Sequence, residues 1–127
     1  IHNSLGSSDI QVVILGNGQV GYTHPNKVYG AMYIGKPILY IGPKESHVAD
    51  LLSDLKGNIS VQHGESKILA NKIELLFSKN WDEINSIGQN NLTYAKNNFH
   101  PDVLKQKMID YLSKHCKKHL KSIPILA

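Results

Sequence analysis

The sequence predicts an α/β domain with three or so parallel strands, flanking helices and a C-terminal helical tail. Short apolar runs at 10–15, 38–41 and 59–62 read as strands, and stretches with helical periodicity separate them. The run at 38–41 is continuously apolar, which is typical of a strand covered on both faces. Helices between successive strands indicate parallel pairing through right-handed crossovers.

A glycine-bearing loop follows the first predicted strand, which spans Ile10 to Leu15. The loop holds Gly16, Gly18 and Gly21, and Gly16-Asn17-Gly18 marks a turn. The spacing is not the dinucleotide-binding fingerprint, because a helix would have to open directly on a tight G-x-G-x-x-G. Glycines in this loop permit close approach of the backbone to a ligand.

The next element is a helix that begins directly after this loop. Thr23 or His24 is expected at its start and Pro25 at its first position, where a missing N–H costs nothing. Gly35 is expected to end it in a left-handed conformation, and Pro37 prevents its continuation. The inward face is expected to carry Val28, Met32 and Tyr33. The free N–H groups at its start predict an anion site, most often for phosphate.

Four further helices and their buried positions follow from the same periodicity. Ser46 is expected to cap a helix that runs through Leu55, and Ser66 to cap the next one. The inward residues of these two helices are expected to be Val48, Leu51, Leu52 and Leu55, then Ile68, Leu69, Ile73, Leu76 and Phe77. A helix over 81–98, with Ile84, Ile87 and Tyr94 inward, is weakened by Gly88 and its asparagines. Residues 99–102 break it, and a last helix is expected from about Val103 to Leu120.

Composition limits the function classes. The 127 residues carry a formal net charge of +4, which arises in residues 101–127, and arginine is absent. Nucleic-acid binders usually rely on the guanidinium fork, so no nucleic-acid partner is expected. No apolar run reaches the length of a membrane helix. The one cysteine, Cys116, fits a reducing cytoplasm.

Pro25-Asn26-Lys27, then seven residues, then Gly35-Lys36-Pro37-Ile38-Leu39 resembles the "P-S-K … G-(K/R)-P-(V/I)" signature of family-4, or group 1, glycosyltransferases. The stretches 7–13 and 41–50 resemble the neighbouring strand and loop of that family, so the likeness covers about residues 3 to 63. It implies that residues 1–127 form a single Rossmann-like, C-terminal domain of a two-domain (GT-B) enzyme. An N-terminal acceptor domain would then be missing from this chain.

The resemblance implies transfer of a sugar from a nucleoside diphosphate-sugar donor to a glycan or lipid-linked acceptor. His24, Pro25, Asn26 and Lys27 would bind the donor diphosphate, with no cofactor and no essential metal. The fragment alone is expected to be inactive. The family's paired glutamates would fall near Tyr22 and at Gly30, so ribose binding by a helix carboxylate is not implied.

Other residues near strand ends are candidate donor contacts with structural alternatives. Gly21 and Tyr22 would meet the sugar or phosphates, the alternative being a plain turn. Tyr29 would contact the nucleoside, or else pack in a half-buried site, and His47 follows a strand end as well. For Lys27 the alternative is a solvated lysine at an ordinary helix start. No catalytic residue is assigned.

Three alternatives to the binding and partner predictions stay open. A nucleotide-sugar epimerase of the same architecture would bind a similar donor but transfer nothing to an acceptor, and a non-catalytic α/β interaction module is the other alternative function. His115, Cys116 and His119 have i, i+4 spacing that could trap zinc adventitiously, but no metal site is predicted. The last helix is expected to pack by an apolar stripe (Leu104, Met108, Ile109, Leu112, Cys116 and Leu120), the alternative being peripheral membrane contact through its lysines.

A sheet of three strands leaves an inner edge exposed, which is an aggregation liability. The sequence therefore predicts that further strands precede Ile1, and that the bare chain is paired, swapped or incompletely stable.

Overall fold

The computed structural model of the chain describes residues 7–21 and 26–115. It divides into two compact units, one up to Ala95 and one from Lys96 onward, and each is described by itself. None of the helices among the described residues is long and apolar enough to cross a membrane.

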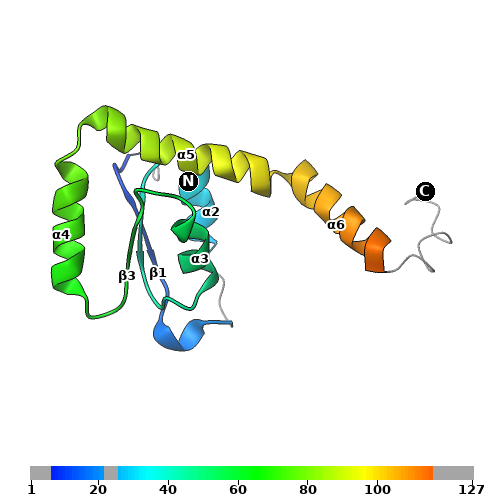
Figure 1. The fold of residues 1–127 in the computed structure, drawn as a ribbon, viewed down its shortest axis with the longest axis horizontal. Helices are drawn as coiled ribbons and strands as arrows, with labels where there is room; N and C mark the ends of the chain where they lie inside the picture. Colours follow the sequence, from blue (N-terminus) through cyan, green and yellow to red (C-terminus); the bar gives the residue numbers. More distant parts are fainter. Residues whose placement is uncertain (1–6, 22–25, 116–127) are drawn as a thin grey trace. The chain divides into compact units, whose positions relative to one another are not determined.

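The first unit contains a parallel sheet in the order β1-β2-β3 (Figure 1). The strands are β1 (Gln11–Ile14), β2 (Ile38–Ile41) and β3 (Ile59–Val61). Gln11 is level with Ile38, and Leu39 is level with Ile59. The predicted strands, their parallel pairing and the α/β class are confirmed. Strand β2 has the bounds of its apolar run, while β1 and β3 are shorter than theirs.

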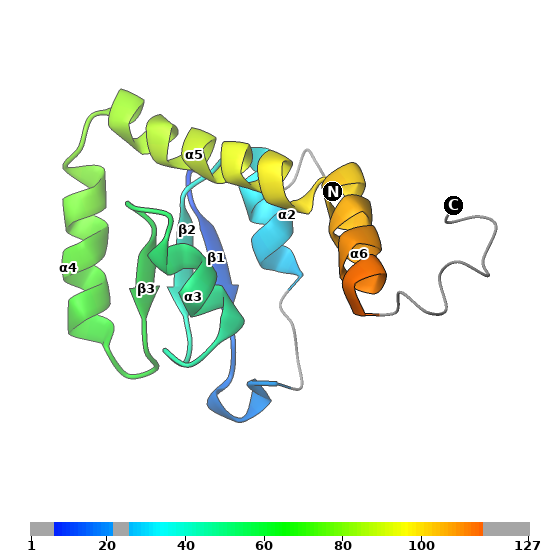
Figure 2. The same cartoon turned by 45° about the vertical axis from the view of Figure 1, so that its right-hand side comes forward.

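Helices lie on both faces of this sheet (Figure 2). On one face lie α2 (Lys27–Ile34) and α3 (His47–Ser53), and on the other lies α4 (Ser66–Phe77). A short 3-10 helix, η1 (Asn17–Gln19), follows β1 in the predicted turn. Helix α5 (Trp81–Phe99) crosses near the strands' amino ends, opposite the edge where their carboxyl ends lead into loops (Figure 2).

Two predicted helix ends have the expected geometry. Gly35 terminates α2 with φ 74° and ψ 39°, a left-handed conformation that favours glycine, and its N–H bonds to Met32 O at 3.0 Å. Ser46 caps α3, because its Oγ accepts a hydrogen bond from Ala49 N at 3.1 Å. The four predicted inward residues of this region, Val48, Leu51, Leu52 and Leu55, are all buried.

Two other helix starts differ from the prediction. Helix α2 begins at Lys27, two residues beyond the predicted position, with Asn26 as its cap. Tyr22, Thr23, His24 and Pro25 lie outside the described residues. Ser66 is the first helical residue of α4 and not its cap. Glu65 holds the cap position without a side-chain cap bond.

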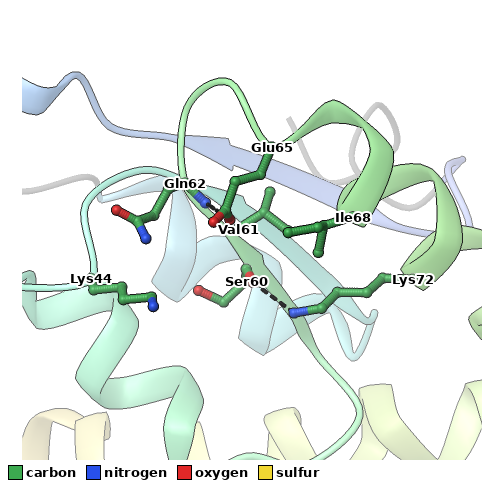
Figure 3. A pocket seen from close by; sticks show the side chains of 7 residues that line it. All are labelled: Lys44, Ser60, Val61, Gln62, Glu65, Ile68 and Lys72. Atoms are coloured by element: carbon green, nitrogen blue, oxygen red, sulfur yellow. Dashed lines mark hydrogen bonds between the residues drawn. The ribbon is translucent and has the colours of Figure 1, made fainter.

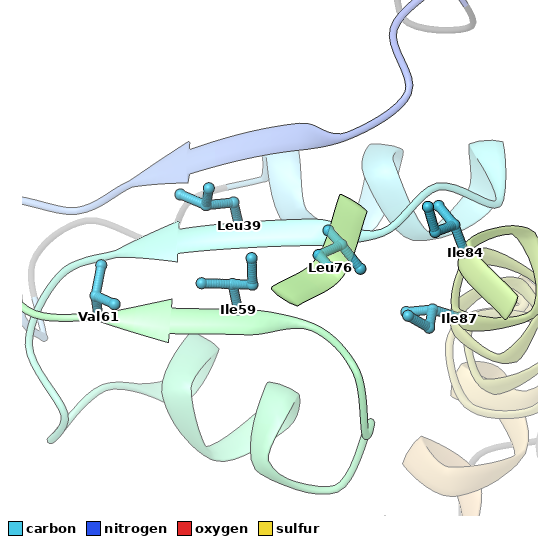
Figure 4. Close-up of a cluster of buried hydrophobic side chains, with 6 residues drawn as sticks. All are labelled: Leu39, Ile59, Val61, Leu76, Ile84 and Ile87. Atoms are coloured by element: carbon cyan, nitrogen blue, oxygen red, sulfur yellow. The ribbon is translucent and has the colours of Figure 1, made fainter. Parts of the chain in front are cut away.

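The core beneath α4 is narrower than the sequence predicts (Figure 4). Leu76 packs with Leu39, Ile59, Val61, Ile84 and Ile87, while Leu69 and Ile73 are partly buried against them. Ile68 and Phe77 are exposed, so their predicted burial is wrong. They flank the inward stripe by roughly a quarter turn, and the sheet ends at β3 beneath this helix. Phe77 instead packs edge-to-face against Trp81.

Helix α5 is anchored by residues that the sequence interpretation counted as weaknesses. Its buried positions are Ile84, Ile87, Gly88, Asn91 and Ala95, whereas Tyr94, predicted inward, is half-buried. A Cβ added to Gly88 would lie 2.0 Å from Gly35 O, so only glycine allows this approach.

The second unit contains α6 (Pro101–His115). Its start at Pro101, two residues before the predicted one, uses proline at the first helical position. None of its residues is buried. Leu104 and Met108 of the predicted stripe are exposed, and Ile109 and Leu112 are half-buried. Cys116, His119 and Leu120 lie outside the described residues.

Candidate functional site

The candidate site lies at the carboxyl edge of the sheet, where β1 leads into η1 and then into α2. Gly21 adopts φ 84° in this connection, a conformation that favours glycine. Asn26 and Lys27 are exposed at the start of α2, while the next residue, Val28, is fully buried against the sheet. The buried Val28 side chain anchors α2 against the sheet, while Asn26 and Lys27 at the start of the helix stay accessible to solvent.

Asn26, which holds the cap position of α2, makes no side-chain cap bond. The first main-chain N–H groups that bond within it belong to Tyr29 and Gly30, at 3.2 and 3.5 Å from Asn26 O. The first turn contains no acidic residue. Among the described residues, the N–H groups of Asn26, Lys27 and Val28 therefore precede the helical hydrogen-bond ladder without an acidic neighbour. Their partial positive charge and the Lys27 ammonium have the same sign.

The other candidate contacts occupy neighbouring positions along the chain. Tyr29 is half-buried one turn into α2, and burial raises the pKa of its phenol above the usual value. His47 is the exposed first residue of α3, which follows the carboxyl end of β2. Parallel strands bring the segments that follow β1 and β2 to one edge of the sheet. Tyr22, His24 and Pro25, which complete the predicted set, lie outside the described residues.

His63 is a component of this edge that the sequence interpretation did not assign to ligand binding. Its Nε2 lies 2.7 Å from Leu15 O, so the ring, which follows β3, reaches across to the end of β1. The bond requires a proton on Nε2, because a carbonyl only accepts. Gly42 lies between them, and a Cβ there would come within 2.9 Å of Leu15 O. His63 directly follows the Gln62 end of the third apolar run, and this position was the only available signal.

A hydrogen-bonded cluster holds the loop between β2 and α3. Tyr40 is fully buried, and its hydroxyl lies 2.8 Å from Ser46 Oγ. Ser46 Oγ also donates to Pro43 O at 3.0 Å. The cap of α3 is therefore tied to the interior of β2, which gives the predicted helix cap a second structural role.

A separate cleft of about 230 Å³ lies along the open side of β3 (Figure 3). It is lined by Lys44, Ser60, Val61, Gln62, Glu65, Ile68 and Lys72, so it includes none of the predicted donor-binding residues. Among the residues that the structure describes, no three histidine, cysteine, aspartate or glutamate side chains come together as a metal site would require.

Comparisons of the chain with protein-family models, with curated proteins and with solved structures found no match.

Proposed function

We propose that this chain supplies part of the donor diphosphate site of a glycosyltransferase that uses a nucleoside diphosphate-sugar. The observation that carries the proposal is the start of α2, where Asn26 and Lys27 are exposed and Asn26 makes no side-chain cap bond. This feature follows β1 at the carboxyl edge of a parallel sheet, where open α/β sheets place their ligands. The signature resemblance at 25–39 supplies the substrate class.

In this proposal the diphosphate oxygens accept hydrogen bonds from main-chain N–H groups at the start of α2. The helix dipole and the Lys27 ammonium stabilise negative charge as the diphosphate leaves the sugar. Tyr29 and His47 line the donor side of the same edge. The acceptor site and the catalytic base belong to a domain outside these 127 residues, so this chain alone transfers no sugar.

Titration of the intact polypeptide with a panel of nucleoside diphosphates tests this role. Lys27→Ala is expected to weaken diphosphate binding about tenfold or more, because a charge-assisted hydrogen bond is lost. Affinity for the free nucleoside should hardly change, since the lysine faces only the phosphates.

Lys67→Ala is the matched control, because Lys67 is an exposed lysine in the first turn of α4. It should leave both affinities unchanged. Equal losses of diphosphate and nucleoside affinity in the Lys27 variant would contradict the proposed role.

A further inference from the structure

The two outer edges of the sheet differ in whether side chains hydrogen-bond to their outward-facing main-chain groups. On β3, Ser60 and Gln62 direct their main-chain groups away from β2. Lys72 Nζ donates to Ser60 O at 3.0 Å, and Glu65 Oε2 accepts from Gln62 N at 2.8 Å (Figure 3). Both side chains come from the segment that follows β3. They occupy positions that a further strand would need, so β3 is built as the end of a sheet.

The described part of the chain gives the opposite edge, on β1, no comparable protection. Gln11 N bonds to Pro37 O and Leu15 N to Ile41 O, so the alternating residues Val12 and Ile14 direct their main-chain groups away from β2. No strand pairs with β1 on that side within the described ranges 7–21 and 26–115. Among the residues that the structure describes, no charged side chain bonds to this edge as Lys72 and Glu65 bond to β3.

One face of β1 is also uncovered. Val13 is 1% exposed because α2 packs on its face, whereas Val12 and Ile14, on the other face, are 37% and 61% exposed. Leu39 of β2 is level with Val12 of β1, and it is buried in the core beneath α4. Apolar β-branched residues on both faces are typical of a strand covered on both sides. The cover over β1 is therefore missing from one side only.

We propose that β1 is an interior strand of a larger sheet, completed by a parallel strand and a helix from the same polypeptide outside these 127 residues. The strand would pair with the main-chain groups of Val12 and Ile14, and the helix would pack on their side chains. A second copy related by a two-fold axis normal to the sheet would pair β1 with β1 in antiparallel fashion. The three strands present are all parallel, and purely parallel sheets are over-represented.

This completion has a consequence for where a ligand binds. Helices α2 and α3 both lie on one face as the chain winds from β1 toward β3. A right-handed unit whose helix lies on the Val12 and Ile14 face must wind in the opposite direction. The winding would then reverse at β1, and crevices for ligands form at such a reversal, beside Leu15. The inference holds whether or not the ligand is a nucleotide sugar.

Hydrogen exchange on unmutated protein provides the first test. The amides of Val12 and Ile14 are compared in the 127-residue chain and in the intact polypeptide that contains it. Their protection should rise at least about tenfold in the intact polypeptide, because they gain strand partners there. The Ser60 and Gln62 amides should change little, since β3 remains an edge. Equal protection of Val12 and Ile14 in both proteins would overturn the proposal.

A pair of lysine substitutions provides the second test. Ile14→Lys and Leu75→Lys alter residues of similar exposure, 61% and 66%, on β1 and α4. In the intact polypeptide, Ile14→Lys should lower the melting temperature by about 5 °C or more, because a charge enters a covered site. Leu75→Lys should lower it far less, and in the 127-residue chain the two variants should be alike.

Two results would overturn the assignment of the partner. One is an equal effect of the two substitutions in the intact polypeptide. The other is a dimer of the 127-residue chain, seen by sedimentation velocity, that Ile14→Lys dissociates while Leu75→Lys does not. That dimer would identify a second copy as the occupant of the β1 edge.

Discussion

Asn91 joins three segments through its side chain at the amino edge of the sheet. It is fully buried, and its Nδ2 donates to Lys36 O at 2.9 Å. Its amide also pairs reciprocally with the amide of Asn58, at 2.8 and 2.9 Å. Asn58 Oδ1 in turn accepts from Ile38 N at 2.8 Å. Two asparagine side chains therefore satisfy main-chain groups where β2 begins, and they attach α5 to the starts of β2 and β3.

Replacing Asn91 by alanine should destabilise the chain by about 2–4 kcal/mol, because Lys36 O and the Asn58 amide lose buried partners. Asn90→Ala is the matched control, since Asn90 is the exposed neighbour on the same helix. Urea denaturation of the three proteins measures the difference. A loss in the Asn91 variant no larger than in the Asn90 variant would show that the network contributes nothing.

The structural role of a residue can be predicted from the sequence when that role depends on near neighbours in the chain. Gly35 must be left-handed because a helix ends there before Pro37. Ser46 caps the helix that begins at the next residue, by accepting a hydrogen bond from the N–H three positions ahead. Asn91 and Asn58 are 33 positions apart, and nothing in either local pattern indicates that they meet. A mid-helix asparagine lowers helix propensity, so it reads as a weakness until its tertiary partner is known.

Helix α5 approaches α2 so closely that one residue decides whether it fits. The approach is backbone to backbone, with a Cβ on Gly88 only 2.6 Å from the carbonyl carbon of Gly35. Gly88→Ala should therefore cost more than about 2 kcal/mol of stability, because backbone cannot move aside as a flexible side chain can.

Gly30→Ala is the contrasting change within helix α2. No atom lies within 4 Å of a Cβ added there, so alanine should stabilise the protein by about 0.5–1 kcal/mol through helix propensity. Thermal melting of both variants tests the pair. Opposite shifts in melting temperature are expected, and two shifts of the same sign would contradict the account of α5 packing.

At the scale of elements, the predicted fold was more accurate than the predicted faces. Strand and helix order follows from local periodicity, which depends on residues close in sequence. The width of a buried stripe depends on how much sheet lies beneath the helix. Helix α4 covers an edge strand, so Leu69, Ile73 and Leu76 face the core while Ile68 borders the cleft beside β3. Nothing in the local sequence indicates where the sheet ends.

At the carboxyl edge of the sheet, the sequence predicted the order of elements but not every side-chain contact. The start of α2 at the carboxyl edge follows from the order of elements, whereas His63 contacts Leu15 across 48 positions. Periodicity carries no information on such a contact, because it depends on how the three strands align.

Across the whole sheet, stability and solubility depend on what happens at its two edges. An exposed strand edge is a template for pairing with another chain, and a lysine over it is a common protection. Lys72 has this role on β3, where its Nζ bonds to Ser60 O. The same helix carries a second lysine, Lys67, which is exposed and lies outside the cleft. The two lysines therefore separate the effect of charge from the effect of position.

Lys72→Met should increase self-association, because it frees Ser60 O and leaves an apolar side chain beside the edge. Lys67→Met makes the same change in net charge on the same helix and should associate no more than the unmutated protein. Sedimentation velocity over a range of concentrations measures the difference. If both variants associate equally, net charge and not edge protection controls solubility, and β3 would not be a protected edge. If only Lys72→Met associates, the sheet is closed at β3, and any extension of it must occur at β1.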